Sequence, residues 1–265
     1  MDRRNLALYA ALALVLASAA AGLTAQEPGN TMPEKSAPAA APQQGPSNDY
    51  QQKQAHMLQV DFGQLQYYKT ADDEMGAPAP GETRVVFMGD SITHGWNLEQ
   101  SFPGKPYVNR GISGQTTPQM LVRFRQDVIN LHPRVVVILA GTNDIAGNTG
   151  PMTPQETENN IESMSDLATA NHIHVVLCSI TPSINFWWAP GKDPSPKIVV
   201  LNAWIQGYAA QKHFPYVDFY SKMVDAEGGL PKNLSRDGVH PNPAGYAIMA
   251  PVAEAGIQQA LQSPE

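Results

Sequence analysis

RVVFMGDSITHGW, residues 84–96, is the stretch from which the fold can be inferred. Its apolar run at residues 85–88 ends at Gly89, a pattern typical of a short strand buried in a parallel sheet. Asp90 and Ser91 follow, and residues of these types favour a turn that starts a helix. Ser91 would then lie at the carboxyl end of a strand, where open α/β sheets bind their ligands. Taken alone, the serine is better explained as a helix cap, so its role depends on the rest of the chain.

Four further apolar runs have the length of strands: residues 107–109, 134–140, 173–180 and 216–219. Amphipathic patterns between and after them predict helices over residues 116–131, 153–170, 197–212 and 243–262. Strands that alternate with helices in this way form right-handed βαβ units, with helices on both faces of a parallel sheet. A count of about five strands favours a flavodoxin-like three-layer α/β/α sandwich over an eight-stranded barrel.

The charge and the N-terminal residues indicate an exported protein that does not bind nucleic acid. The 265 residues include 17 basic and 24 acidic side chains, a formal charge of −7, so no basic surface is expected. Arg3 and Arg4 precede an apolar stretch at residues 6–23. This pattern predicts a signal peptide over residues 1–25, with an uncleaved membrane anchor as the alternative. We expect a secreted or periplasmic protein without stable membrane insertion after signal cleavage.

The remaining chain divides into three segments by composition. Residues 26–48 are rich in Pro, Ala and Gln without hydrophobic periodicity, which predicts a flexible linker. Residues 49–80 form an N-terminal extension that we expect to be partly helical, and residues 81–265 form the α/β domain. Cys178 is the only cysteine, so no intrachain disulfide is expected. The sequence gives no guide to the oligomeric state.

Three residues have the chemistry that attack on an ester carbonyl requires. Ser91 offers the oxygen nucleophile, and a neutral imidazole at His240 can take its proton. Asp237 precedes the histidine by three residues, so one local turn can hold the carboxylate against the ring. Each residue alone has an ordinary explanation, because Asp-Gly is usually a turn and His240 precedes a proline. Their occurrence together, next to predicted strands and helices, favours a hydrolytic site.

Hydrolysis of an ester also requires hydrogen-bond donors for the oxyanion. The backbone N–H of Ser91, a backbone N–H from the glycine-rich turn at residues 110–114, and the side-chain amide of Asn143 are the candidates. Glycine in that turn lets the backbone approach a substrate closely. The turn contains both Gly111 and Gly114, and local chemistry does not choose between them. Asn143, for its part, more often caps a helix than polarises a carbonyl.

These residues occur in four blocks that resemble the SGNH (GDSL-type) hydrolase family of esterases and lipases: residues 89–93 (GDSIT), 109–117 (NRGISGQTT), 141–144 (GTND) and 237–241 (DGVHP). The resemblance covers residue 84 to the C-terminus and implies the SGNH hydrolase fold and a carboxylic ester hydrolase. It assigns the nucleophile, base and acid to Ser91, His240 and Asp237. It assigns the oxyanion donors to Ser91, Gly114 and Asn143, and implies no cofactor.

Other classes of protein fit the chain less well. An α/β-hydrolase would show Gly-x-Ser-x-Gly, but Thr93 stands where that motif has its second glycine. A metallophosphoesterase would need a ligand cluster, and His172 and His174 have no third ligand nearby, so we expect no metal. A non-catalytic carbohydrate-binding module on the same fold would have lost at least one of the three reactive residues, and all three are present.

We expect the substrate to be an ester carried by a small molecule or a polymer. Trp187 and Trp188 follow the fourth predicted strand, so they are candidates to stack on sugar rings or to contact acyl chains. Packing of the loop explains this pair equally well. His94 lies just past Ser91 and is a further candidate for the cleft. We expect short acyl esters, above all acetyl groups on carbohydrate, and the alternative is a lysophospholipase or a lipid esterase like platelet-activating-factor acetylhydrolase.

Overall fold

The computed structural model of the protein describes residues 48–263. The predicted signal peptide, and the predicted linker apart from Asn48, lie outside these residues. No helix within the described part of the chain is long and apolar enough to cross a lipid bilayer.

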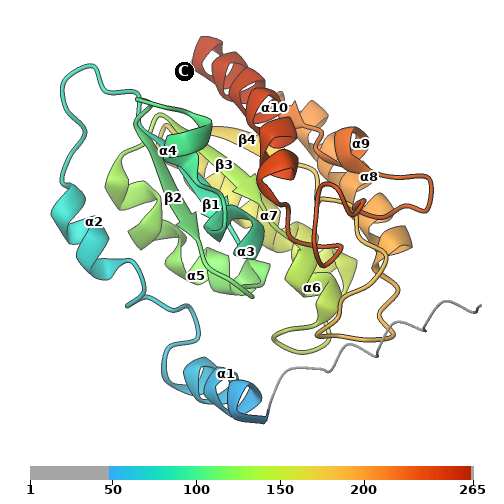
Figure 1. Ribbon diagram of the computed structural model, residues 1–265. Helices are drawn as coiled ribbons and strands as arrows, with labels where there is room; N and C mark the ends of the chain where they lie inside the picture. Colours follow the sequence, from blue (N-terminus) through green and yellow to red (C-terminus); the bar gives the residue numbers. More distant parts are fainter. Residues whose placement is uncertain (1–47, 264–265) are drawn as a thin grey trace, which may run out of the picture. The chain divides into compact units, whose positions relative to one another are not determined.

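A parallel sheet of five strands forms the centre of the domain, in the order β2-β1-β3-β4-β5. The strands β2, β1, β3 and β4 can be followed in Figure 1. The strands are β1 (Val85–Gly89), β2 (Tyr107–Gly111), β3 (Val135–Leu139), β4 (His174–Cys178) and β5 (Tyr216–Val217). In the sheet, Val85 pairs with Tyr107 on one side and with Val135 on the other. Because all five strands run in the same direction, their carboxyl ends meet at one edge of the sheet.

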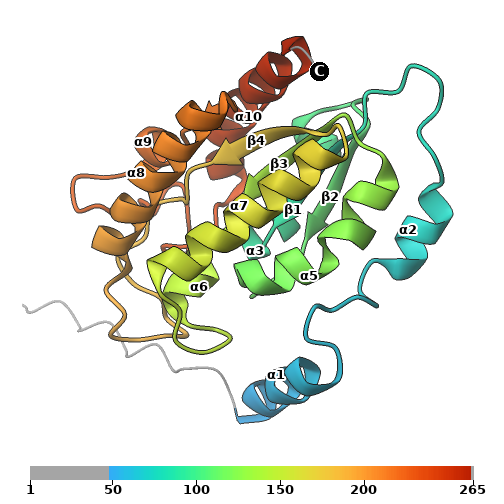
Figure 2. The same cartoon turned by 180° about the vertical axis from the view of Figure 1, so that it is seen from behind.

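Helices cover both faces of this sheet (Figures 1 and 2). One layer contains α5 (Thr117–Asp127), α7 (Pro154–Ala170) and α8 (Pro194–Lys212), and the other contains α3 (Ser91–His94), α4 (Leu98–Ser101) and α10 (Pro243–Gln262). Side chains alternate between the layers along each strand. In β1, Val86 and Met88 pack in the first layer, while Val85 and Phe87 pack in the second. The expected three-layer α/β/α sandwich is therefore confirmed.

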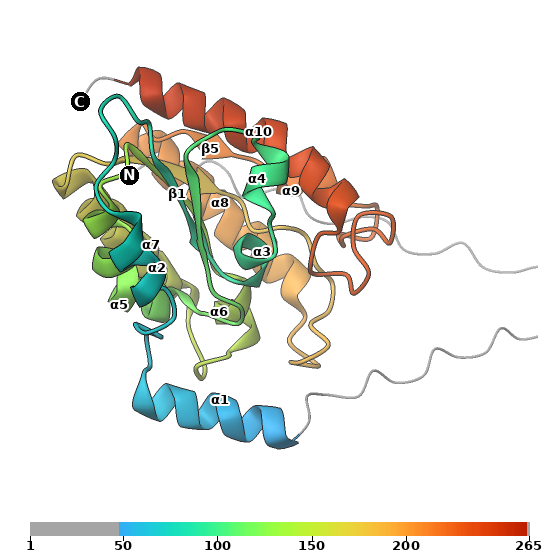
Figure 3. The ribbon, with the colours of Figure 1, turned by 60° about the vertical axis from the view of Figure 1, so that its left-hand side comes forward.

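The remaining elements are short connecting helices and the two helices of the N-terminal extension. They are η1 (Ile129–Leu131), α6 (Thr142–Ala146) and α9 (Tyr220–Met223), with α1 (Asn48–Val60) and α2 (Lys69–Met75) before the first strand. The extension is bonded to the domain at α2, since Asp72 Oδ1 accepts a hydrogen bond from Arg110 Nε at 2.8 Å. Figure 3 shows α2 beside α5, and α1 at the end of the sheet where α3 and α6 also lie.

The fourth strand is shorter than its sequence indicates. The apolar run continues to residue 180, but the strand ends at Cys178. Asn202 of α8 takes both backbone groups of Ile180, accepting its N–H at 2.7 Å and donating to its carbonyl at 3.0 Å. These bonds replace the sheet ladder and direct the chain into the loop that follows. Other boundaries also differ from expectation: α5 ends at Asp127 before the 3-10 turn, α8 begins at Pro194, and β5 ends at Val217. The second strand continues to Gly111, and the third is one residue shorter than expected at each end.

Candidate active site

Ser91 is the first residue of α3, immediately beyond the carboxyl end of β1. Asp90 caps this short helix, because its Oδ1 accepts the N–H of Ile92 at 2.9 Å. Gly89 makes the sharp exit from the strand possible, since a Cβ there would collide with the Thr93 side chain and lie 2.7 Å from the Leu139 carbonyl oxygen. The turn therefore presents the serine hydroxyl at the edge of the sheet.

The turn that follows α9 and the loop after it bring His240 to Ser91. His240 Nε2 lies 2.9 Å from Ser91 Oγ, and its Nδ1 lies 2.6 Å from Asp237 Oδ2. The other carboxylate oxygen of Asp237 accepts the backbone N–H groups of Val239 at 3.0 Å and His240 at 2.8 Å. An ionised carboxylate can only accept, so it fixes the tautomer with the proton on Nδ1 and leaves Nε2 free to accept from the serine.

Two carboxyl groups near Ser91 have shifted pKa values of opposite sign. Partial burial acts to raise the pKa of Asp237, but hydrogen bonds from the His240 ring and from the two backbone N–H groups outweigh it and lower the pKa to about 2. Asp237 is thus ionised in the folded protein at neutral pH. Complete burial raises the pKa of Asp90 to about 6, although the N–H of Ile92 and the nearby His240 act in the opposite direction.

The two glycines of the second block have different surroundings. Gly111 packs against α3, where an added Cβ would lie 2.7 Å from His94 Cα, so this glycine serves close packing. Gly114 has φ of +81° and lines the pocket that contains Ser91. That φ is in the region that favours glycine. Neither Gly114 nor Ser91 donates its backbone N–H to another residue of the described part of the chain.

Asn143, in α6, is buried beside this turn. Its Nδ2 donates to the Gln115 carbonyl at 3.0 Å and makes a longer contact of 3.3 Å with Asp90 Oδ2. Its Oδ1 accepts from Asn148 Nδ2 at 3.0 Å. The Asn143 side chain lines the same pocket as Ser91 and Gly114, so all three expected donor residues meet at one place.

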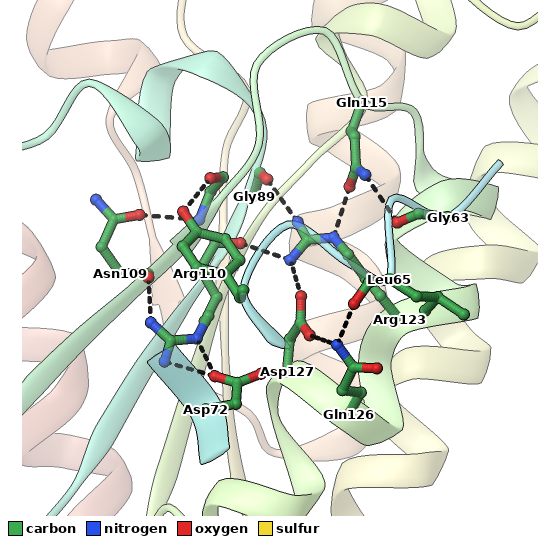
Figure 4. A network of polar contacts seen from close by, with 12 residues as sticks. Gly63, Leu65, Asp72, Gly89, Asn109, Arg110, Gln115, Arg123, Gln126 and Asp127 are labelled. Atoms are coloured by element: carbon green, nitrogen blue, oxygen red, sulfur yellow. Dashed lines mark hydrogen bonds and ion pairs between the residues drawn. The ribbon is translucent and has the colours of Figure 1, made fainter. Parts of the chain in front are cut away.

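A buried polar network bonds to the glycine-rich turn at residues 110–114 and to the residue after it (Figure 4). Arg123 is fully buried, and its guanidinium donates to the carbonyls of Gly89 and Arg110 at 3.1 and 2.8 Å. It also donates to Gln115 Oε1 at 2.6 Å, while Gln115 Nε2 donates to the carbonyl of Gly63 at 3.1 Å. The network therefore joins the exit of β1, the glycine-rich turn and the N-terminal extension.

The pocket above Ser91 and His240 has a volume of about 540 Å³, within the range of small-molecule sites. Trp187, Trp188 and Ala189 form one part of its wall. The Trp188 ring centroid lies 6.2 Å from that of His240. Helix α1 and the residues after it form another part of the wall, through Ala55, Met57, Leu58 and Gln64.

His94 does not line this pocket, contrary to the expectation from its position in the sequence. Its Nδ1 lies 2.8 Å from Ser113 Oγ, and its Nε2 lies 3.1 Å from the hydroxyl of Tyr67. These two contacts link α3 to the glycine-rich turn and to the N-terminal extension. Within residues 48–263, no three His, Cys, Asp or Glu side chains are grouped so that they could hold a metal ion.

Sequence analysis did not identify the wall formed by α1 or the bonds of Asn148. Met57 and Leu58 belong to a segment outside the recognisable blocks, and their place depends on contacts with a distant part of the chain. Asn148 lies five residues beyond Asn143, in a Gly-Asn-Thr-Gly turn that reads as an ordinary loop. No local pattern marks either feature.

Comparison with known proteins identifies the class of this domain. The model of the GDSL-like lipase/acylhydrolase family matches residues 87–248, so the chain belongs to that family. Esterase TesA of Pseudomonas aeruginosa is 29% identical over 168 residues, which are 61% of this chain and 77% of the esterase. The protein is accordingly a carboxylic ester hydrolase, and the family assignment argues against the non-catalytic binding module.

Two solved structures extend the similarity. A GDSL-like lipase from Bacteroides thetaiotaomicron is 44% identical, with a TM-score of 0.73 over 76% of this chain and 100% of the lipase. A Streptococcus pneumonia protein named for platelet activating factor is 25% identical, with a TM-score of 0.67 over 79% of this chain and 98% of its own. Both share the sheet and the helical layers described above.

Proposed function

We propose that the protein hydrolyses esters through an acyl-enzyme formed on Ser91. The observation that carries this proposal is the aligned chain of contacts from Ser91 Oγ to His240 Nε2 and from His240 Nδ1 to Asp237 Oδ2, at 2.9 and 2.6 Å. His240 takes the serine proton as the oxygen attacks the carbonyl carbon, and returns it to the departing alcohol. Asp237 stabilises the imidazolium that forms in between. A water molecule then attacks the acyl group, with His240 again acting as the base.

The oxyanion that forms in each step is stabilised by the backbone N–H groups of Ser91 and Gly114 and by the Asn143 amide. The two backbone groups are the free donors described above. The 3.0 Å bond from Asn143 to the Gln115 carbonyl sets the orientation of the amide. Its longer 3.3 Å contact with Asp90 is the one that a substrate oxygen can replace.

Short acyl esters, above all acetyl groups on carbohydrate, are the substrates that we propose. Trp187 and Trp188 both line the pocket, and their rings meet edge to face with centroids 5.5 Å apart. Flat indole faces beside the reactive serine can stack on the apolar faces of sugar rings. The pocket is large enough for a sugar unit on the alcohol side of an acetyl ester.

A lipid ester is the second candidate, and the wall formed by α1 favours it. Met57 and Leu58 face the pocket from the extension and offer apolar contacts for an acyl chain. The similarity to the streptococcal protein named for platelet activating factor also supports a lipid ester. Under this alternative the enzyme would act as a lysophospholipase or as an acetylhydrolase of phospholipids.

We further propose that the enzyme acts outside the cytoplasm. The two arginines and the apolar stretch at residues 6–23 support export through a signal peptide over residues 1–25. The composition of residues 26–48 supports a flexible tether between the signal and the domain. Such a protein would meet envelope or environmental esters that are carried on polymers.

Hydrolysis of p-nitrophenyl acetate by the Ser91→Ala variant tests the mechanism. The matched control is Ser163→Ala in α7, where the hydroxyl donates to the Asn159 carbonyl of the same helix. We expect no turnover above background for Ser91→Ala and unchanged turnover for Ser163→Ala. Hydrolysis by Ser91→Ala at the rate of the unmodified protein would refute the mechanism. A chain-length series of p-nitrophenyl esters, run beside acetylated xylan and lysophosphatidylcholine, distinguishes the two substrate classes. Preference for long acyl chains and for lysophosphatidylcholine would favour the lipid alternative.

A further inference from the structure

Asn148 joins three separate segments at the active-site pocket. Its Nδ2 donates to the Gly114 carbonyl at 2.9 Å and to Asn143 Oδ1 at 3.0 Å. Its Oδ1 accepts the indole N–H of Trp188 at 3.0 Å. One amide thus contacts the glycine-rich turn, the proposed oxyanion donor and the aromatic loop.

These bonds form a closed ring of contacts beside the proposed oxyanion site. Asn148 holds the carbonyl of Gly114, and Asn143 holds the carbonyl of the next residue, Gln115. Asn143 and Asn148 are bonded to each other, which completes the ring. Because Asn148 presents an N–H to Asn143, the oxygen of the Asn143 amide must face Asn148 and its NH₂ must face the site. The Gln115 carbonyl binds the NH₂ side of the Asn143 amide and Asn148 binds its oxygen side, so loss of the Asn148 side chain leaves that oxygen without its partner and the amide less tightly held.

The Asn148 side chain is not needed to close its own turn. The backbone N–H of Asn148 donates to the Asn143 carbonyl at 3.1 Å, and that of Gly147 donates to the same carbonyl at 2.9 Å. Gly147, with φ of +79°, ends α6. The end of the helix is therefore satisfied by backbone bonds, and the side-chain amide is available for the pocket.

We propose that Asn148 is a positioning residue for ester hydrolysis, an inference that rests on the proposed function. It orients the Asn143 amide and the Gly114 peptide before the substrate arrives, so that neither has to reorganise as the oxyanion forms. Through the bond to Trp188, it also connects the geometry of these donors to the aromatic wall. A substrate that packs against Trp188 holds this arrangement in place.

Three variants distinguish the role of the Asn148 NH₂ group, which bonds Gly114 and Asn143, from that of its oxygen, which bonds Trp188. Asn148→Ala removes all three bonds. Asn148→Asp keeps the shape and the acceptor for Trp188, but it places a carboxylate oxygen against the Gly114 carbonyl and Asn143 Oδ1, where the NH₂ group was the donor. Trp188→Phe keeps a ring and loses the indole N–H. With p-nitrophenyl acetate, we expect Asn148→Ala to lower kcat by about 10- to 100-fold with KM nearly unchanged, because misplaced donors weaken only transition-state binding. Asn148→Asp should lose more, and Trp188→Phe should lose less.

The energetic coupling between Asn148 and Trp188, measured with the double variant, provides the second readout. If Trp188 acts through Asn148, adding Trp188→Phe to Asn148→Ala should cost less than it costs in the unmodified enzyme. Asn171→Ala is the matched control and should leave kcat unchanged, since within residues 48–263 that amide bonds only the Leu167 carbonyl at the end of α7. Melting temperatures of all variants show whether the fold is kept.

Several outcomes would overturn the proposal. They are an unchanged kcat in Asn148→Ala, a rise in KM with kcat intact, or an Asn148→Asp variant that is folded and fully active. In each case a loss of turnover in Ser91→Ala would show that the proposed function itself stands. If Asn148→Ala does not fold, the comparison of Asn148→Asp with Trp188→Phe decides, and equal kcat values in these two would contradict the assignment.

Discussion

Replacement of Arg123 by methionine should cost the domain about 4 kcal/mol of unfolding free energy, because it leaves a buried charge unpaired. Arg123 and Asp127 both have 0% exposed side chains, and Nη1 lies 2.9 Å from Oδ2. Methionine fills much of the space but cannot neutralise the carboxylate. Breaking a buried pair in this way typically costs about 3–5 kcal/mol.

The neighbours of the pair place the loss within that range. The hydrogen bond from Gln126 Nε2 to Asp127 Oδ1, 3.0 Å long, remains and stabilises the carboxylate. The bonds from Arg123 to the carbonyls of Gly89 and Arg110 are lost, at about 0.5–1.5 kcal/mol net for each. The bond that Gln126 retains offsets part of the loss of the two carbonyl bonds, so we expect a loss near the middle of the range of about 3–5 kcal/mol. Since domains are stable by only about 5–15 kcal/mol, the loss should be easy to measure.

Urea denaturation followed by tryptophan fluorescence measures this loss as a lower midpoint with an unchanged slope. The double variant Arg123→Met/Asp127→Leu removes the unpaired charge and should regain about half of the loss or more. Lys69→Met breaks the exposed pair between Lys69 and Asp73, and should change the free energy by less than about 1 kcal/mol. A single variant as stable as this control, or a double variant no more stable than the single one, would refute the reasoning.

Further predictions concern catalysis, stability and specificity. Asn143→Ala should lower kcat for p-nitrophenyl acetate by about 10² to 10³-fold, and a decrease below tenfold would argue against a role as an oxyanion donor. Asp237→Asn should lower kcat with little change in KM, because the amide no longer fixes the His240 tautomer; unchanged kinetics would contradict the pairing. Burial raises the pKa of Asp144 to about 6, so the folded state binds more protons than the unfolded chain between about pH 4 and 6. Unfolding free energy should therefore fall as pH rises through that window, and Asp144→Asn should flatten the fall in denaturation series at each pH. Met57→Ala should reduce kcat/KM for long p-nitrophenyl esters more than for the acetate. An equal effect on both would show that α1 does not contact the acyl chain.

The layered fold is predictable from the sequence because its signals are local. Each strand is a short apolar run, and the helices between them carry apolar residues at helical spacing, so the order of elements follows from the chain itself. Boundaries shift where a distant side chain intervenes, as Asn202 does at the end of β4. A polar side chain from another element replaces the ladder there, and no pattern near residue 180 reveals it.

The candidate site is predictable to the extent that its residues lie in compact turns. Asp237 and His240 form their contact across a single turn, and Ser91 follows its strand directly, so the structure brings together residues that the sequence singles out. His94 shows the limit of this reasoning, because nearness to Ser91 in the chain does not fix where a helical side chain points. Asn148 and Met57 were missed because only tertiary contacts bring them to the pocket.

Covalent labelling of Ser91 is the most direct test of the central claim that this serine is the nucleophile. The enzyme is treated with a fluorophosphonate ester, whose phosphonyl group remains on an activated serine, and the digested protein is analysed by mass spectrometry. We predict one modified peptide, the one that contains Ser91, with activity lost in proportion to its labelling. A fully labelled protein that still hydrolyses p-nitrophenyl acetate, or a label on another residue that accounts for the lost activity, would contradict the claim.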